Sequence, residues 1–169
     1  MRKIFYTSFL LAATLLSSPA AAAPPPAPAE PLLEIHGITA EGKPFDLSSL
    51  RGKVVQLMFW STDCAVCRNK MPELRLNYQG WQGQPFELVT VSVDQRHEDV
   101  QTCERLIELL VPMQQRFVQL WRGDPNYQDN VDIPSLLPLT YLIDKQGRTA
   151  AIYHGRIPAE TWDQIADLL

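Results

Sequence analysis

The sequence contains little cysteine and little histidine, and this limits the metal chemistry open to it. Each type occurs three times among 169 residues. Two of the cysteines, Cys64 and Cys67, form one C-x-x-C pair. There is no second pair, and the histidines are scattered along the chain. Because a structural zinc site needs about four ligands, the sequence predicts no such metal site. A Cu(I) site made of two thiolates stays open as an alternative.

Basic residues are also scarce relative to acidic ones. The chain has 15 Lys and Arg against 19 Asp and Glu, which gives a formal net charge of −4. Proteins that bind nucleic acids or anionic membrane surfaces usually carry an excess of positive charge. We therefore expect other proteins or small molecules as partners, and no nucleic acid.

The chain lacks an apolar run that is long enough for a comfortable membrane span. Residues 4–16 are mostly apolar, follow the basic pair Arg2 and Lys3, and precede the small residues 17–23. A spanning helix needs about 20 apolar residues, whereas this pattern is typical of a cleavable secretory signal. We expect residues 1–22 to be a signal peptide and the mature protein to be periplasmic, without further membrane contact. An uncleaved anchor is the alternative.

A change of composition separates this leader from the rest of the chain. Residues 23–31 are rich in proline and alanine and favour a stiff, extended linker. Residues 32–169 then predict one domain, because 46% apolar residues overall are enough for a buried core.

Strand and helix patterns alternate along this domain. Residues 54–60 and 86–93 are nearly continuous apolar runs, which favour strands covered on both faces. Helices are expected at 64–78, where Pro72 should cause a kink, and at 97–111. The remaining expected elements are a hairpin formed by 32–38 and 45–50, a short strand at 117–121, a loop or single helical turn at 124–130, a strand pair at 139–143 and 149–153, and a helix at 158–169. Their order predicts an α/β fold with a mixed central sheet and an N-terminal β extension.

The C-x-x-C pair follows a buried strand and opens a helix. Residues i and i+3 of a first helical turn lie close enough for their sulfur atoms to bond. The free N–H groups and the dipole of the helix N-terminus stabilise a thiolate there. Cys64 should therefore be the exposed nucleophile, and Cys67 should resolve the mixed disulfide. A purely structural disulfide is the alternative, although so short a loop contributes little stability.

Several segments resemble the TlpA/ResA-like branch of the thioredoxin family. They are residues 47–53 (LSSLRGK), 59–73 (FWSTDCAVCRNKMPE) and 137–144 (LPLTYLID). The resemblance extends over about residues 33–169. It implies a thioredoxin-like fold and thiol–disulfide oxidoreductase activity, with a redox-active Cys64–Cys67 disulfide and no other cofactor.

The resemblance also implies how partners are bound. Pro138 would be a cis proline facing the cysteine pair, and Leu137 would pair its backbone with a substrate peptide. From its residue type, Trp60 is expected to be a core and site-wall aromatic. Partners would be protein thiols and disulfides, and a membrane thiol-reductant donor of the DsbD/CcdA type.

The sequence departs from the family pattern near the cysteines. Asp63 replaces a tryptophan, Met58 a buried Asp or Asn, and Lys70 a glutamate that is functional in some relatives. A carboxylate beside Cys64 should raise the pKa of its thiol, whereas Arg68 and the helix dipole should lower it. A less stable thiolate disfavours the dithiol form and makes the disulfide harder to reduce, so Asp63 points to a reductant. An oxidase or isomerase is the alternative and would use the same residues.

The same residues leave other functions open. A copper-binding protein on this fold is an alternative, but the Sco-type copper proteins use C-x-x-x-C and a distant histidine. A thiol peroxidase is disfavoured because the segment before Cys64 lacks that family's proline- and threonine-bearing pattern. The third cysteine, Cys103, falls on the apolar side of a predicted helix, so we expect a buried, unreactive thiol.

Overall fold

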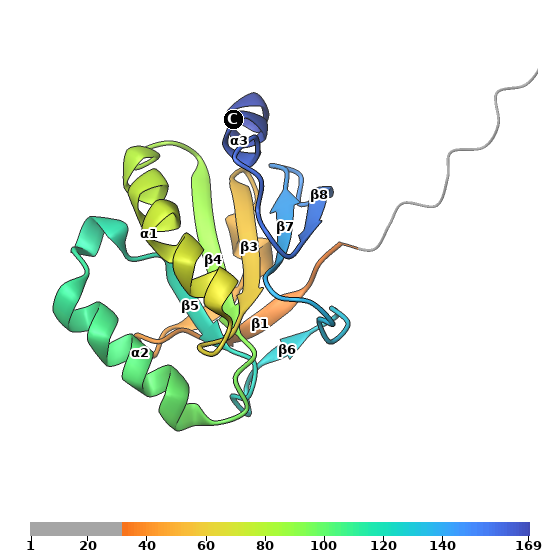
Figure 1. Ribbon diagram of the computed structural model, residues 1–169. Coiled ribbons are helices and arrows are strands. Elements are labelled where there is room, and N and C mark those ends of the chain that lie inside the picture. The colour runs from red at the N-terminus through yellow and green to blue at the C-terminus, as the bar shows by residue number, and fades with distance from the viewer. Residues whose placement is uncertain (1–31) are drawn as a thin grey trace, which may run out of the picture.

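The computed structural model describes residues 32–169, and β3 (Val54–Trp60) lies at the centre of its main sheet. All seven residues of β3 are buried, as the apolar run predicts. β3 pairs in parallel with β4 (Phe86–Ser92) and antiparallel with β7 (Leu139–Ile143). With β5 (Val118–Trp121) and β8 (Thr149–His154), the strand order is β5-β4-β3-β7-β8 (Figure 1). The expected mixed sheet is confirmed.

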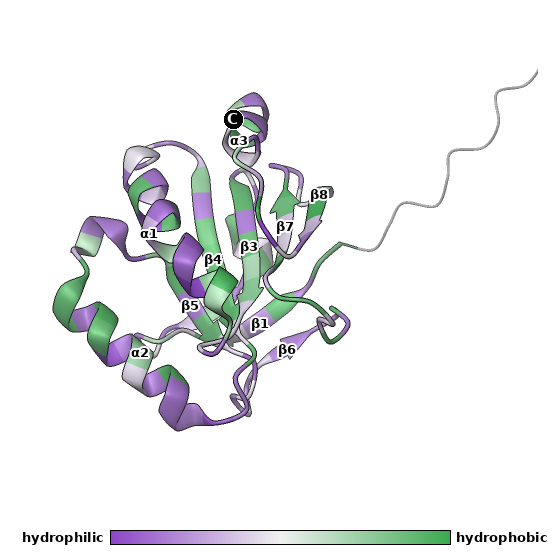
Figure 2. Cartoon of the chain, in the orientation of Figure 1, coloured by the Kyte–Doolittle hydropathy of each residue, from purple (hydrophilic) through white to green (hydrophobic). Residues whose placement is uncertain are grey.

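The side chains of β3 alternate between two cores on opposite faces of the sheet. Leu57 and Phe59 face one core, and Met58 and Trp60 face the other. In Figure 2 the central strands are mainly green, which marks them as hydrophobic. Because both faces are covered, β3 is fixed from both sides, and so is the loop that leaves its carboxyl end.

Three helices accompany the sheet. They are α1 (Ala65–Gly80), α2 (His97–Leu110) and α3 (Thr161–Leu168), and α1 and α3 pack their buried residues against the core that contains Met58. The expected helix over 158–169 begins later than predicted, because a turn precedes it, in which Thr161 at the start of α3 donates its N–H to the Pro158 carbonyl. Within residues 32–169, no helix is both long enough and apolar enough to cross a membrane.

A small antiparallel sheet covers the opposite core. β1 (Ile35–Ile38) lies between β2 (Pro44–Asp46) and β6 (Gln128–Asp129). The N-terminal hairpin is confirmed, except that a short 3₁₀ helix, η1 (Leu47–Leu50), follows β2. A second 3₁₀ turn, η2 (Met113–Gln115), follows α2.

The prediction of a loop or helical turn over residues 124–130 is wrong for its last part, which forms β6. This strand has only two residues, so it leaves no periodic pattern in the sequence. Its partner β1 is remote in the chain, and the side chain of Asn130 joins the two by accepting from the Glu34 N–H at 2.9 Å and donating to the Leu32 carbonyl at 2.9 Å. Pairing of this kind depends on the completed fold.

A nearly buried ion pair holds β6 against β5. The Arg122 guanidinium donates to Asp129 Oδ1 at 2.8 Å, and the two side chains are 21% and 3% exposed. Asp129 Oδ1 also accepts from the Val131 N–H at 3.0 Å. We expect Asp129→Ala to lower the free energy of unfolding by about 2 kcal/mol, because it leaves a largely buried guanidinium without its counter-charge.

Chemical denaturation measures this effect, with Asp132→Ala as the matched control. Asp132 is exposed, so its replacement should change stability by no more than about 0.5 kcal/mol. Equal stabilities of the two variants would contradict the assigned role of Asp129.

Candidate active site

The two cysteines of the C-x-x-C pair form a disulfide at the start of α1. Their Cα atoms are 5.3 Å apart. Cys64 is the N-cap residue, and its Sγ accepts from the Cys67 N–H at 3.2 Å. Cys67 is fully buried, whereas Cys64 is partly exposed. A thiol or disulfide approaching from solvent can therefore reach Cys64 and not Cys67.

The loop between β3 and α1 is held by a carboxylate from the neighbouring strand. Asp94 follows β4 and accepts from the Thr62 N–H at 3.0 Å and from the Thr62 hydroxyl at 2.7 Å. The Ser92 hydroxyl donates to the same carboxylate at 2.6 Å, and Trp121 Nε1 donates to the Asp94 carbonyl at 2.8 Å. These bonds fix the loop two residues before Cys64.

Asp94 is not among the site residues that the sequence predicts. A signal for it exists, because a carboxylate directly follows the second of two adjacent parallel strands, whose carboxyl ends meet at one edge. The same edge carries the loop that leads to Cys64.

Asp63 and Arg68 both lie beside the disulfide and are exposed. The carboxylate of Asp63 accepts from the Ser61 hydroxyl. The guanidinium of Arg68 donates to the Thr62 carbonyl. The loop before Cys64 thus anchors one negatively charged and one positively charged side chain.

The segment opposite α1 contains a cis peptide bond between Leu137 and Pro138, as expected. Pro138 is buried, and its carbonyl accepts from the Gly155 N–H at 2.8 Å. Among residues 32–169, the N–H and C=O of Leu137 make no hydrogen bond. A free donor and a free acceptor therefore stand next to the start of β7, where another extended chain could pair with them.

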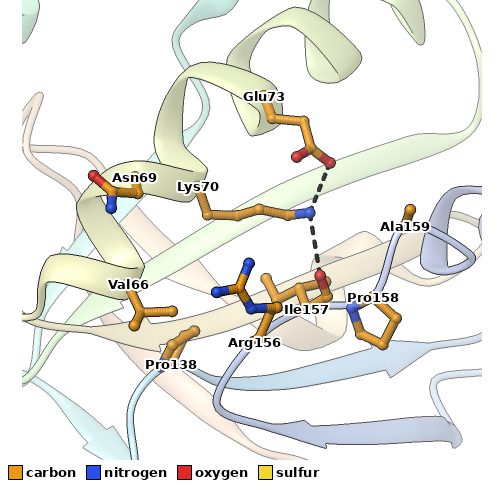
Figure 3. A pocket seen from close by; sticks show the side chains of 9 residues that line it. All are labelled: Val66, Asn69, Lys70, Glu73, Pro138, Arg156, Ile157, Pro158 and Ala159. Carbon is orange, nitrogen blue, oxygen red and sulfur yellow. Dashed lines mark hydrogen bonds and ion pairs between the residues drawn. The ribbon is translucent and has the colours of Figure 1, made fainter.

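Two pockets flank the disulfide. One, of about 410 Å³, is formed between α1 and the segments at Pro138 and after β8, and Val66 of the C-x-x-C motif lines it (Figure 3). The other, of about 640 Å³, is lined by Leu137 on one side and by Asp63 and Asp94 on the other. The Leu137–Pro138 bond thus contributes one residue to each pocket.

Trp60 does not line either of these pockets. It is buried in the core beneath α1 and borders a third pocket of about 360 Å³ between α1 and α2, together with Met71 and Cys103. The structure therefore brings Leu137 and Pro138 beside the disulfide and places Trp60 below it, as support for α1.

Lys70 connects α1 to the segment that precedes α3. Its Nζ donates to Glu73 Oε1 at 2.7 Å and to the Ile157 carbonyl at 3.2 Å. Trp162 Nε1 also donates to Glu73 Oε1, at 2.8 Å. Burial acts to raise the pKa of Glu73, but the hydrogen bonds from Lys70 and Trp162 outweigh it and the pKa lies below its ordinary value. Glu73 therefore stays ionised near neutral pH and holds the Lys70 ammonium.

In the part of the chain that the structure describes, no three His, Cys, Asp or Glu side chains cluster closely enough to hold a metal ion. Cys64 and Cys67 are already bonded to each other, so the site offers disulfide chemistry.

The third cysteine has a different environment. Cys103 lies on α2 with partial exposure and carries a free thiol. Burial raises the pKa of this thiol, and the nearby Arg75 guanidinium offsets only part of the rise. Since the thiolate is the reactive form, Cys103 should react slowly at neutral pH.

This expectation gives a test by alkylation of the reduced protein. At neutral pH we expect iodoacetamide to modify Cys64 at least about tenfold faster than Cys103. Raising the pH should accelerate the Cys103 reaction, because its thiolate population grows. Peptide mapping by mass spectrometry measures both rates, and Cys103→Ser provides the control for site assignment. Comparable rates at neutral pH would contradict the assignment.

These features define a class of protein. A C-x-x-C disulfide that caps a helix at the carboxyl end of a central strand, facing a cis-proline loop on a mixed five-stranded sheet, is a thioredoxin-like dithiol–disulfide site. Residues 26–164 match the AhpC/TSA family, and the chain belongs to this family.

More specific similarities support this placement. The chain is 30% identical over 114 residues to "Thiol-disulfide oxidoreductase ResA" of Bacillus subtilis. The match covers 68% of this chain and 60% of that relative's length. The resemblance to the ResA-like branch is therefore confirmed as a distant similarity.

Solved structures confirm the fold. A thiol:disulfide interchange protein from Chlorobium tepidum superposes with a TM-score of 0.63 at 21% identity, covering 83% of this chain and 96% of the other. A DsbF homologue from Corynebacterium diphtheriae gives 0.62 at 21% identity, with coverage of 82% and 86%.

Proposed function

We propose that the protein is an exported thiol–disulfide oxidoreductase that reduces disulfides in other exported proteins, as in cytochrome c or metal-centre maturation. The observation that carries the proposal is the asymmetry of the disulfide. Cys64 is accessible at the cap of α1, and Cys67 is buried one turn inside the helix. The similarity to ResA supports the same activity.

The reaction follows from this asymmetry. In the reduced protein, the Cys64 thiolate attacks one sulfur of a substrate disulfide, forms a mixed disulfide and releases the other substrate sulfur as a thiolate. The Cys67 thiolate then attacks Cys64 Sγ, which forms the Cys64–Cys67 disulfide and releases the second substrate thiolate. Two electrons pass to the substrate, whose two sulfurs take up protons from water.

The substrate backbone would be aligned by Leu137. An extended peptide that pairs with the free N–H and C=O of Leu137 would lie across the disulfide, between the two flanking pockets. Backbone pairing of this kind accepts many sequences, which suits a protein that acts on several substrates.

Asp63 favours electron flow from this protein to its substrate. Its carboxylate lies next to Cys64, opposes thiolate formation and thereby makes the disulfide harder to reduce. A strongly reducing pair needs an electron source, and we propose a membrane thiol-reductant donor of the DsbD/CcdA type. The leader-like residues 1–22 lie outside the described residues, and a periplasmic location is part of the proposal.

The roles of the two cysteines are tested by substitution. We expect Cys64→Ser to reduce insulin no faster than the reaction without protein, because the attacking thiolate is absent. Cys67→Ala should accumulate a mixed disulfide through Cys64, because nothing resolves it. Turbidity of the insulin B chain measures the first effect, and non-reducing mass spectrometry measures the second.

Cys103→Ser serves as the control and should keep the normal rate. Normal turnover by the Cys64 variant would rule the mechanism out. Rapid consumption of hydrogen peroxide, with insulin left oxidised, would favour a peroxidase instead.

The electrostatic effect of Asp63 is tested by Asp63→Asn. Removing the exposed charge should lower the pH at which the Cys64 thiolate forms by roughly half a pH unit. The reduction potential against glutathione should become less negative. Thiolate ultraviolet absorbance and a glutathione redox titration measure the two quantities. An unchanged thiolate titration would count against this argument for a reductant.

A further inference from the structure

The 410 Å³ pocket beside the disulfide carries an excess of positive charge. Its lining contains two cations, Lys70 and Arg156, and one carboxylate, Glu73. Lys70 is bound to Glu73 at 2.7 Å, so the charges of this pair largely cancel. Arg156 supplies the remaining positive charge.

Arg156 is free to bind a ligand. It is exposed on the segment after β8 and extends into the pocket toward α1 (Figure 3). Its guanidinium makes no hydrogen bond or ion pair with any of residues 32–169. Other arginines near the site are engaged: Arg68 donates to the Thr62 carbonyl, and Arg96 pairs with Asp99 at 2.6 Å.

The pocket on the other side of the disulfide has the opposite character. Asp63, Asp94 and Asp99 line it, and Arg96 is its one cation among the lining residues. A peptide lying across Leu137 and Pro138 would therefore meet a positive pocket on one side of its reactive cysteine and a negative pocket on the other.

We propose that the Arg156 pocket binds an acidic side chain located near the reactive cysteine of the substrate protein. This inference rests on the proposed disulfide-reductase function and names a substrate class for it. The guanidinium can donate two parallel hydrogen bonds to a carboxylate. Val66, Pro138 and Ile157 provide apolar surface for the methylene groups of a Glu or Asp side chain.

The test uses short peptides closed by one disulfide, each with Glu, Gln or Lys at the residues flanking the cysteines. The protein is reduced, separated from its reductant and mixed with each peptide, and the second-order rate constant of peptide reduction is measured. We expect the Glu peptide to react about fivefold faster than the Lys peptide, the size expected for an exposed ion pair. High salt should remove most of this preference.

Variants assign the preference to Arg156. In Arg156→Glu the Lys peptide should be reduced faster than the Glu peptide. In Arg156→Lys the Glu peptide should remain the faster of the two. Arg105→Glu is the matched control, because Arg105 is an exposed arginine on α2 that lines neither pocket at the disulfide. It should retain the wild-type order.

A binding measurement separates this inference from the proposed function. Peptides with serine in place of both cysteines are titrated calorimetrically into the disulfide form, and the Glu version should bind more tightly than the Lys version. Equal rates and equal binding for both peptides, or an unchanged order in Arg156→Glu, would overturn the inference. If no peptide is reduced but the Glu version still binds more tightly than the Lys version, the proposed reductase function is overturned instead.

Discussion

The site depends on one local arrangement: the first turn of α1 begins at the carboxyl end of β3, so that Cys64 caps the helix. In this position Cys64 Sγ accepts the Cys67 N–H at 3.2 Å. That N–H would otherwise lack a partner, as at any helix start, and it faces the sulfur that must carry negative charge during exchange. The same turn buries Cys67. Helix capping, thiolate stabilisation and the division of roles between the two cysteines thus have one structural cause.

Two side-chain contacts hold the elements around this turn in place. Asp94 binds both polar groups of Thr62 and so fixes the approach to Cys64. On the other side, Lys70 joins α1 to the Ile157 carbonyl. Between them the backbone of Leu137 is left unpaired among the described residues. A rigid frame with one unpaired edge loses little conformational entropy when a peptide docks.

The parts of the fold that the sequence predicts are those that depend on local patterns. The apolar run of β3 and the 3.6-residue period of α2 are read directly from neighbouring residues. The cysteine spacing likewise places both sulfurs on one helical turn. Features that depend on distant pairing were missed: β6 has two residues and needs β1, and Asp94 acts on a loop 32 residues earlier in the chain. Trp60 was expected as a core and site-wall aromatic, and the alternation along β3 places it in the core beneath α1, where it also borders the pocket between α1 and α2.

The identity of residue 70 also determines what Arg156 can do. The resemblance to the ResA-like branch implies a glutamate at this position in some relatives. Such a glutamate beside Glu73 would give the pocket two carboxylates against one guanidinium, and Arg156 would be the nearest available counter-charge. Lys70 instead donates hydrogen bonds to Glu73 at 2.7 Å and to the Ile157 carbonyl at 3.2 Å. Arg156 is then left without a partner among the described residues. Under the proposal, the charge of residue 70 thus decides whether the pocket repels or attracts carboxylates. It does so without altering the cysteines or the backbone that presents the substrate, so specificity can change while the exchange chemistry stays the same.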